Sequence, residues 1–205
     1  MLSAREALAR LKDGNRRFVS DASETTATQA RRQALAAGQE PFAIVLGCSD
    51  SRVPAEIIFD QGLGDLFVIR VAGNIVASSQ VDSVEFAAAR YATKLVVVLG
   101  HTQCGAILAT VEELKQPAER RSKSLRSIVD RVRPSVEALL AAGLEDDALV
   151  AHSVRANIRA SVDHLRHGSQ VLERLIATEG LVIVGAEYSL ETGEVAFFDG
   201  VPEGW

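Results

Sequence analysis

The chain has 205 residues, of which 47% are apolar and 24% charged, and this is an ordinary composition for one globular domain. Its formal net charge at pH 7 is −5, so the composition does not favour nucleic acid or an anionic membrane as a partner. No apolar run approaches the roughly 18–20 residues of a membrane span, and the N-terminus lacks the apolar stretch of a secretory signal. We therefore expect a single domain over residues 1–205 that functions in the cytoplasm.

The N-terminal segment is predicted to be helical. Ser3 and Glu6 have the spacing of a capping box, and apolar residues recur with the helical period from Ala7 to Phe18. Residues 1–38 remain rich in alanine and helical in character. This N-terminal helical arm could pack on its own sheet, but we expect it to pack on a partner subunit.

Four short apolar runs predict strands that are buried on both faces, at residues 42–47, 65–71, 94–100 and 180–188. Helical patterns are found at residues 81–92, 104–115, 122–142 and 152–180, the third broken by Pro134 and the last divided at Gly168. This alternation predicts an α/β fold with a central, mostly parallel sheet of four strands and helices on both faces. Residues 194–200 follow a short turn, so we expect them to form an antiparallel edge strand.

Both cysteines of the chain directly follow predicted strands. Cys48 lies in the stretch GCSDSRVP after the first strand, and Cys104 lies in GHTQCGAI after the third. Ligands bind at the carboxyl ends of the strands in open α/β sheets, and these two strands are expected to be neighbours. His101 is spaced so that it can share an ion with Cys104. Cys48 would complete a Cys₂His set typical of zinc, with Asp50 as a potential fourth ligand.

Other chemistries fit these loops less well. A cysteine-dependent phosphatase loop has a longer spacing than the three residues between Cys48 and Arg52. The Gly-rich fingerprint of dinucleotide-binding folds is absent after the first strand. Two cysteines are too few for an iron–sulfur cluster held by thiolates. From spacing alone, a buried structural cysteine and a loop histidine remain alternatives to a metal site.

The same motifs resemble those of a known family. CSDSRVP, DLFVIRVAGN, SVEFA and GHTQCGAI occur in this order between Gln39 and Ile107, and the chain is similar there to the β-class carbonic anhydrases of the plant type. The resemblance implies a zinc ion bound by Cys48, His101 and Cys104. It also implies that Asp50 and Arg52 form a catalytic pair beside this ion.

The resemblance further implies a substrate site. It assigns binding of the substrate to Gln39 and an apolar pocket for CO₂ to Phe67, Ala72 and Phe86, with the Gly105 N–H directed at bicarbonate. In the family, the glutamine and the pocket aromatics face the zinc of the partner subunit. We therefore expect a homodimer, or a higher even-numbered homo-oligomer, with active sites at the dimer interface.

The activity implied is the reversible hydration of CO₂. Two alternatives use the same zinc: hydrolysis of a CO₂ analogue such as CS₂ or COS, and a non-catalytic protein in which Asp50 closes the site permanently. Some β-class enzymes close in this way at low pH, and they carry tryptophan where this chain has Val45. We therefore expect Arg52 to hold Asp50 off the metal here. Arg70, in the second strand, has no partner that the sequence identifies.

Overall fold

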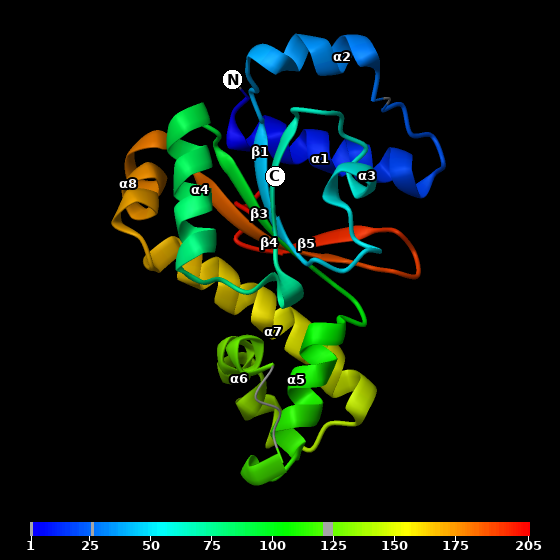
Figure 1. Ribbon diagram of the computed structural model, residues 1–205, viewed down its shortest axis with the longest axis vertical. Coiled ribbons are helices and arrows are strands. Elements are labelled where there is room, and N and C mark those ends of the chain that lie inside the picture. The colour runs from blue at the N-terminus through cyan, green and yellow to red at the C-terminus, as the bar shows by residue number, and fades with distance from the viewer. Residues whose placement is uncertain (1, 26, 121–124) are drawn as a thin grey trace.

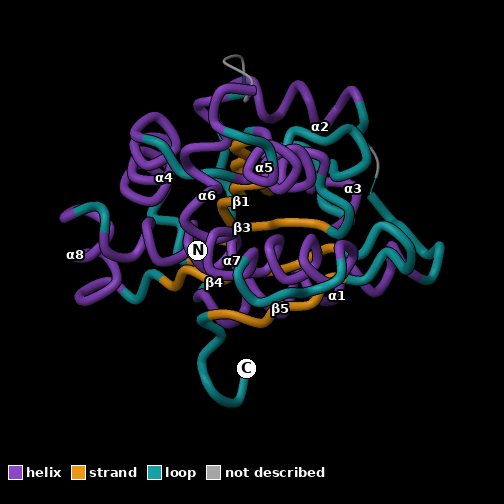
Figure 2. Tube along the Cα trace, turned by 90° about the horizontal axis from the view of Figure 1, so that it is seen from below, coloured by secondary structure: helices purple, strands orange, loops and turns teal. Residues whose placement is uncertain are grey.

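The computed structural model describes residues 2–25, 27–120 and 125–205. A five-stranded sheet forms its centre, built from β1 (Ala43–Gly47), β2 (Leu66–Arg70), β3 (Leu95–His101), β4 (Val182–Tyr188) and β5 (Val195–Asp199). The strand order is β2-β1-β3-β4-β5, and Figure 2 shows the last four following one another. All neighbours are parallel except β5, which is antiparallel to β4. This confirms the predicted fold class, including the antiparallel edge strand and the adjacency of the first and third strands.

Helices cover both faces of the sheet (Figure 1). The α-helices are α1 (Ala4–Val19), α2 (Gln29–Ala34), α3 (Ala55–Ile58), α4 (Ser78–Tyr91), α5 (Gly105–Lys115), α6 (Arg126–Leu140), α7 (Asp146–His167) and α8 (Gln170–Glu179). Short 3₁₀ turns are η1 (Leu35–Ala37), η2 (Ala72–Asn74) and η3 (Ala118–Arg120). Among the described residues, none of these helices combines the length and the apolar character needed to cross a bilayer.

The sheet separates two apolar cores because side chains alternate between faces along each strand. Ile44 and Leu46 of β1 point into the larger core, which α4 to α8 cover. Ala43 and Val45 point into the smaller core, which α1 and α3 cover. All five residues of β1 are buried, and so are all seven of β3. Burial on both faces explains why these strands are continuous apolar runs in the sequence.

The N-terminal arm divides into two parts with different packing. The capping box of Ser3 and Glu6 is present at the start of α1, and the α1 residues Leu8 and Leu11 pack on the chain's own sheet. Gly14 lets α1 approach α3 closely, because a Cβ there would lie 1.8 Å from the Phe59 carbonyl oxygen. By contrast, α2 buries no residue. Packing on a partner subunit therefore remains a prediction, and within the arm it now applies to α2.

The prediction that Pro134 breaks the third helical stretch is wrong, whereas the division at Gly168 is confirmed. Pro134 lies inside α6, which continues through it. The buried residues Val132 and Val136 flank the proline on the face that joins the larger core. Packing on both sides of Pro134 thus maintains the helix despite the lost backbone hydrogen bond. Gly168 caps α7, and α8 begins at Gln170.

Candidate metal centre

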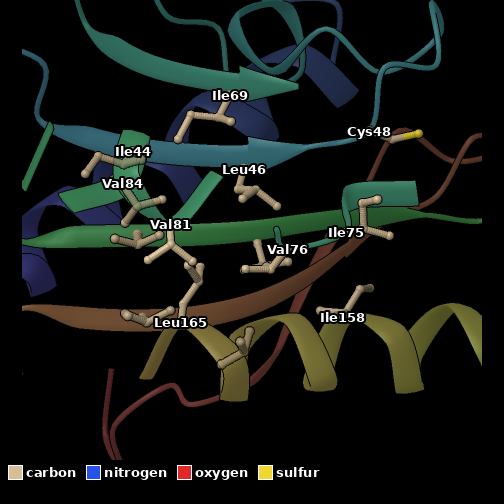
Figure 3. Close-up of a cluster of buried hydrophobic side chains, with 14 of the residues drawn as sticks. Ile44, Leu46, Cys48, Ile69, Ile75, Val76, Val81, Val84, Ile158 and Leu165 are labelled. Carbon is tan, nitrogen blue, oxygen red and sulfur yellow. The ribbon is translucent and has the colours of Figure 1, made fainter. Parts of the chain in front are cut away.

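Three potential metal ligands come together at the carboxyl ends of β1 and β3. Cys48 directly follows β1, His101 is the last residue of β3, and Cys104 is the N-cap of α5. The two strands pair in parallel, with Gly47 opposite Leu99, so both loops emerge at the same edge. Figure 3 shows Cys48 where the strand ends, beyond the apolar side chains of the larger core. The ligand atoms of the three residues all lie within 4.8 Å of one another.

The geometry of this trio fits a zinc ion. The two sulfur atoms are 3.9 Å apart. Tetrahedral zinc with Zn–S bonds of about 2.3 Å requires a sulfur–sulfur separation of about 3.8 Å. His101 is fully buried and its Nδ1 lies 2.9 Å from the Thr102 carbonyl oxygen, while its Nε2 has no hydrogen-bond partner in the described part of the chain. A zinc-binding histidine usually has this arrangement: one ring nitrogen contacts a carbonyl, here Nδ1, and the other is free to bind the metal, here Nε2.

The two thiols are in direct contact, and this contact affects the pKa of each. The contact with Cys104 lowers the pKa of Cys48 to about 4, and His101 and the N–H groups of Asp50 and Gly73 act in the same direction against the effect of burial. The same contact with Cys48, together with burial, raises the pKa of Cys104. A cation bound between the two sulfurs would stabilise both thiolates.

Asp50 and Arg52 form the predicted pair beside the trio. The Arg52 guanidinium donates from Nε to Asp50 Oδ1 at 2.9 Å and from Nη2 to Oδ2 at 2.7 Å. The Arg52 backbone N–H also donates to Oδ1, at 3.0 Å. These bonds, led by those from the Arg52 side chain, hold the pKa of Asp50 well below its usual range. An ionised carboxylate therefore stands next to the trio, with Oδ2 3.9 Å from His101 Nε2.

Arg70 is a site residue that the sequence did not identify. It ends β2 opposite Gly47, and its guanidinium donates to the carbonyl oxygens of Cys48 at 3.0 Å and Asp50 at 2.6 Å. It therefore fixes the backbone of the loop that carries one ligand and the carboxylate. An arginine at the end of an otherwise apolar strand was the available signal, and its partners in the structure are main-chain carbonyls.

Two of the predicted substrate residues lie near the trio. Ala72 precedes Gly73, whose N–H donates to the Cys48 sulfur at 3.4 Å. Gly105 follows Cys104 and begins α5, and a Cβ placed on it would meet nothing within 4 Å. There is consequently open space at the N-terminus of α5, directly beside a ligand.

The other three predicted substrate residues gather elsewhere. Phe67, Phe86 and Tyr91 form an aromatic cluster with ring centroids 5.9–6.2 Å apart, and Gln39 donates to the Tyr91 hydroxyl at 3.1 Å. In register, Phe67 lies opposite Ile44, four residues before Cys48, which is about 13 Å along the strand. Within one chain, this aromatic cluster does not reach the metal trio. Tyr91 is a member that the sequence analysis missed.

Comparisons with known proteins agree with this geometry. The family model described as carbonic anhydrase matches residues 43–195. Carbonic anhydrase 2 of Mycobacterium tuberculosis is 39% identical over 190 residues, covering 92% of this chain and 90% of the relative. The carbonic anhydrase of Mycolicibacterium smegmatis is 40% identical over 186 residues, covering 90% and 88%.

Solved structures give the class. The β-carbonic anhydrase CafA of Aspergillus fumigatus superposes with a TM-score of 0.75 at 26% identity, covering 97% of this chain and 91% of that one. A structure from Sordaria macrospora, described as a tetrameric β-carbonic anhydrase, gives a TM-score of 0.71 at 26% identity and covers 82% and 85%. The chain therefore belongs to the carbonic anhydrase family, and its fold is that of the β class.

Proposed function

We propose that this chain catalyses the reversible hydration of CO₂ to bicarbonate and a proton, with one zinc ion per chain held by Cys48, His101 and Cys104. The observation that carries the proposal is the buried trio at tetrahedral spacing beside an ionised Asp50, in a chain of the carbonic anhydrase family. When bound, zinc would lower the pKa of a water molecule so that hydroxide is present near neutral pH.

Asp50 and Arg52 would then serve that nucleophile. The thiolates of Cys48 and Cys104 cancel the charge of the cation, so neighbouring groups must favour and orient an anionic nucleophile. The Asp50 carboxylate would accept the hydrogen of that hydroxide and so orient an oxygen lone pair toward the carbon of CO₂. Arg52, which forms two parallel hydrogen bonds to Asp50, would keep this carboxylate ionised and off the metal.

Bicarbonate would be held at the N-terminus of α5. The Gly105 N–H opens this helix of 11 residues, and the absence of a side chain leaves space for a planar anion beside Cys104. Ala72 is half-buried and directly precedes Gly73, which contacts the Cys48 sulfur, and it would form part of the apolar wall for CO₂.

Gln39, Phe67 and Phe86 would complete the site of a partner subunit rather than their own. Phe86 is 53% exposed in the single chain, which is unusual for a large aromatic side chain, and Gln39 is also exposed. A homodimer or higher even-numbered homo-oligomer with active sites at the interface would bury both residues. The free ligand thiols require a reducing compartment, which favours the cytoplasm.

Stopped-flow CO₂ hydration and zinc analysis on the same sample test the proposal. We expect about one zinc per chain and rapid hydration that increases from about pH 7 to pH 8.5. Full zinc occupancy without hydration at either pH would instead indicate a non-catalytic zinc-stabilised protein. A parallel assay with CS₂ and COS distinguishes hydrolysis of these analogues, which would overturn the proposal if it replaced CO₂ turnover.

A further inference from the structure

The turn η2 has an unusual backbone next to the candidate metal centre. Gly73 has φ 70° and ψ 20°, and the next residue, Asn74, has φ 43°. Two consecutive residues are therefore left-handed, and only the first is a glycine. The left-handed conformation is unfavourable for most residues with a side chain, and asparagine tolerates it better than most. Such a turn persists only where surrounding groups hold it.

Two side chains of α7 hold this turn. Asn157 Nδ2 donates to the Gly73 carbonyl oxygen at 2.8 Å, and Ser161 Oγ donates to the Asn74 carbonyl oxygen at 3.0 Å. Both side chains come from buried residues, 2% and 5% exposed, and they lie one helical turn apart on the same face of α7. The helix therefore fixes two successive carbonyls of the turn, and the first of them belongs to Gly73, so that α7 anchors this residue on the side opposite its N–H.

The orientation of the turn matters because its N–H group reaches the metal trio. The Gly73 N–H donates to the Cys48 sulfur at 3.4 Å, and the Asp50 N–H donates to the same sulfur at 3.4 Å. In Figure 3, Ile75, which follows the turn, lies in the view between Cys48 at the end of β1 and Ile158 on α7. The larger core thus connects α7 to the ligand through this turn.

We propose that Asn157 and Ser161 are positioning residues for the ligand Cys48, because they keep the Gly73 N–H on its sulfur. An N–H donor withdraws electron density from a thiolate and so weakens its donation to a bound cation. In a site with two thiolates, this restraint preserves the ability of the metal to polarise water. The inference rests on the proposed zinc site, and it adds two residues far from the ligands in sequence.

The test replaces each donor and observes the sulfur directly. In Asn157→Leu, the leucine side chain has the same number of heavy atoms as asparagine but no hydrogen-bond donor. Ser161→Ala removes only the hydroxyl. With Co²⁺ as the probe, the sulfur-to-cobalt charge-transfer band of both variants should move to lower energy, because the thiolate becomes more electron-rich. Zinc affinity, measured by competition with a chelator, should decrease by roughly 10–100-fold, the usual effect of losing an outer-sphere contact, because Cys48 is no longer held in position.

Matched controls separate this effect from simple loss of packing. Ser153 lies on the same helix, is fully buried, and has a hydroxyl without a partner in the described residues, so Ser153→Ala should leave the band and the zinc affinity unchanged. Ser161→Thr keeps the hydroxyl and should restore both. If Asn157→Leu does not fold, the comparison of Ser161→Ala with Ser161→Thr decides the question.

Each outcome has a definite meaning. If the variants keep the wild-type band and zinc affinity and lose only melting temperature, the α7 contacts are purely structural and the inference is wrong. Metal binding by the wild type without CO₂ hydration would refute the proposed function but leave this inference standing. If the wild type takes up neither zinc nor cobalt, both are overturned.

Discussion

Replacing Asp60 by asparagine should remove about 2 kcal/mol from the free energy of unfolding at pH 7, and the loss should shrink in acid. Asp60 lies just after α3 with its side chain 1% exposed. It accepts a hydrogen bond from Arg17 Nε at 2.5 Å and others from the backbone N–H groups of Glu24 and Thr25 at 3.0–3.2 Å. Burial alone would raise the pKa of Asp60, but these bonds outweigh it and lower the pKa to about 2.

The magnitude and its pH range follow from that shift. The ordinary value is 3.8, so the folded state prefers the ionised carboxylate by just under two pKa units. At about 1.4 kcal/mol per unit, this is about 2 kcal/mol of stability. Because the folded pKa is the lower one, the contribution is fully present at pH 5 and above. It decreases to about 1 kcal/mol at pH 3 and disappears below pH 2.

Urea unfolding of Asp60→Asn and the wild type at pH 7, 5 and 3, at one protein concentration, measures this directly. Asp13→Asn is the matched control, since Asp13 also pairs with an arginine of α1 but its side chain is 52% exposed. Its effect should stay within about 0.5 kcal/mol. A loss for Asp60→Asn that is equally large at pH 3 and pH 7 would refute the reasoning, because it could not come from ionisation.

Further predictions concern the site and the packing of α1. Cys48→Ser and Cys104→Ser should each lose zinc, and full zinc retention in either variant would contradict the ligand assignment. Asp50→Asn should keep zinc, but its kcat/KM for CO₂ hydration should fall by about 100-fold or more, because an amide cannot replace the carboxylate. If this variant has the wild-type kcat/KM at pH 8, Asp50 has no role in the mechanism. Wild-type activity should increase with pH along a one-proton curve, and a steeper, cooperative decrease below about pH 8 would contradict an Asp50 held off the metal. Gly14→Ala should destabilise the fold by about 1–3 kcal/mol, although this substitution usually stabilises a helix, and an unchanged thermal midpoint would show that α1 can move away from α3.

The strands and the metal trio could be predicted because each depends on local sequence. A strand buried on both faces is a continuous apolar run, and its end is where a parallel sheet presents functional groups. Cys48, His101 and Cys104 stand directly at such ends. The break predicted at Pro134 does not form, because the packing of α6 on both sides of the proline outweighs the local cost of an interior proline.

The remaining site residues depend on contacts between distant segments. Arg70 reaches the Cys48 loop only because β1 and β2 pair with Gly47 opposite Arg70. Asn157 could be placed on the buried face of a helix, but the carbonyl that it meets is 84 residues away. The proposed contribution of Gln39 to a partner's site would depend on a second copy of the chain, which a single sequence does not position. Local sequence patterns thus predict the candidate ligands well. They predict poorly the residues from distant segments that fix the position of those ligands.

The parallel pairing of β1 with β3 also links metal binding to correct folding, because the ligands come together only when the two strands are in register. Cys48 and Cys104 are 56 residues apart, and β2 and α4 lie between them in the chain. Their sulfurs meet only when Gly47 stands opposite Leu99, because a slip of one residue would turn every side chain of a strand to the opposite face. A chain with misaligned strands would therefore present no complete set of three ligands. Stable zinc binding would therefore be limited to molecules in which β1 and β3 are correctly aligned.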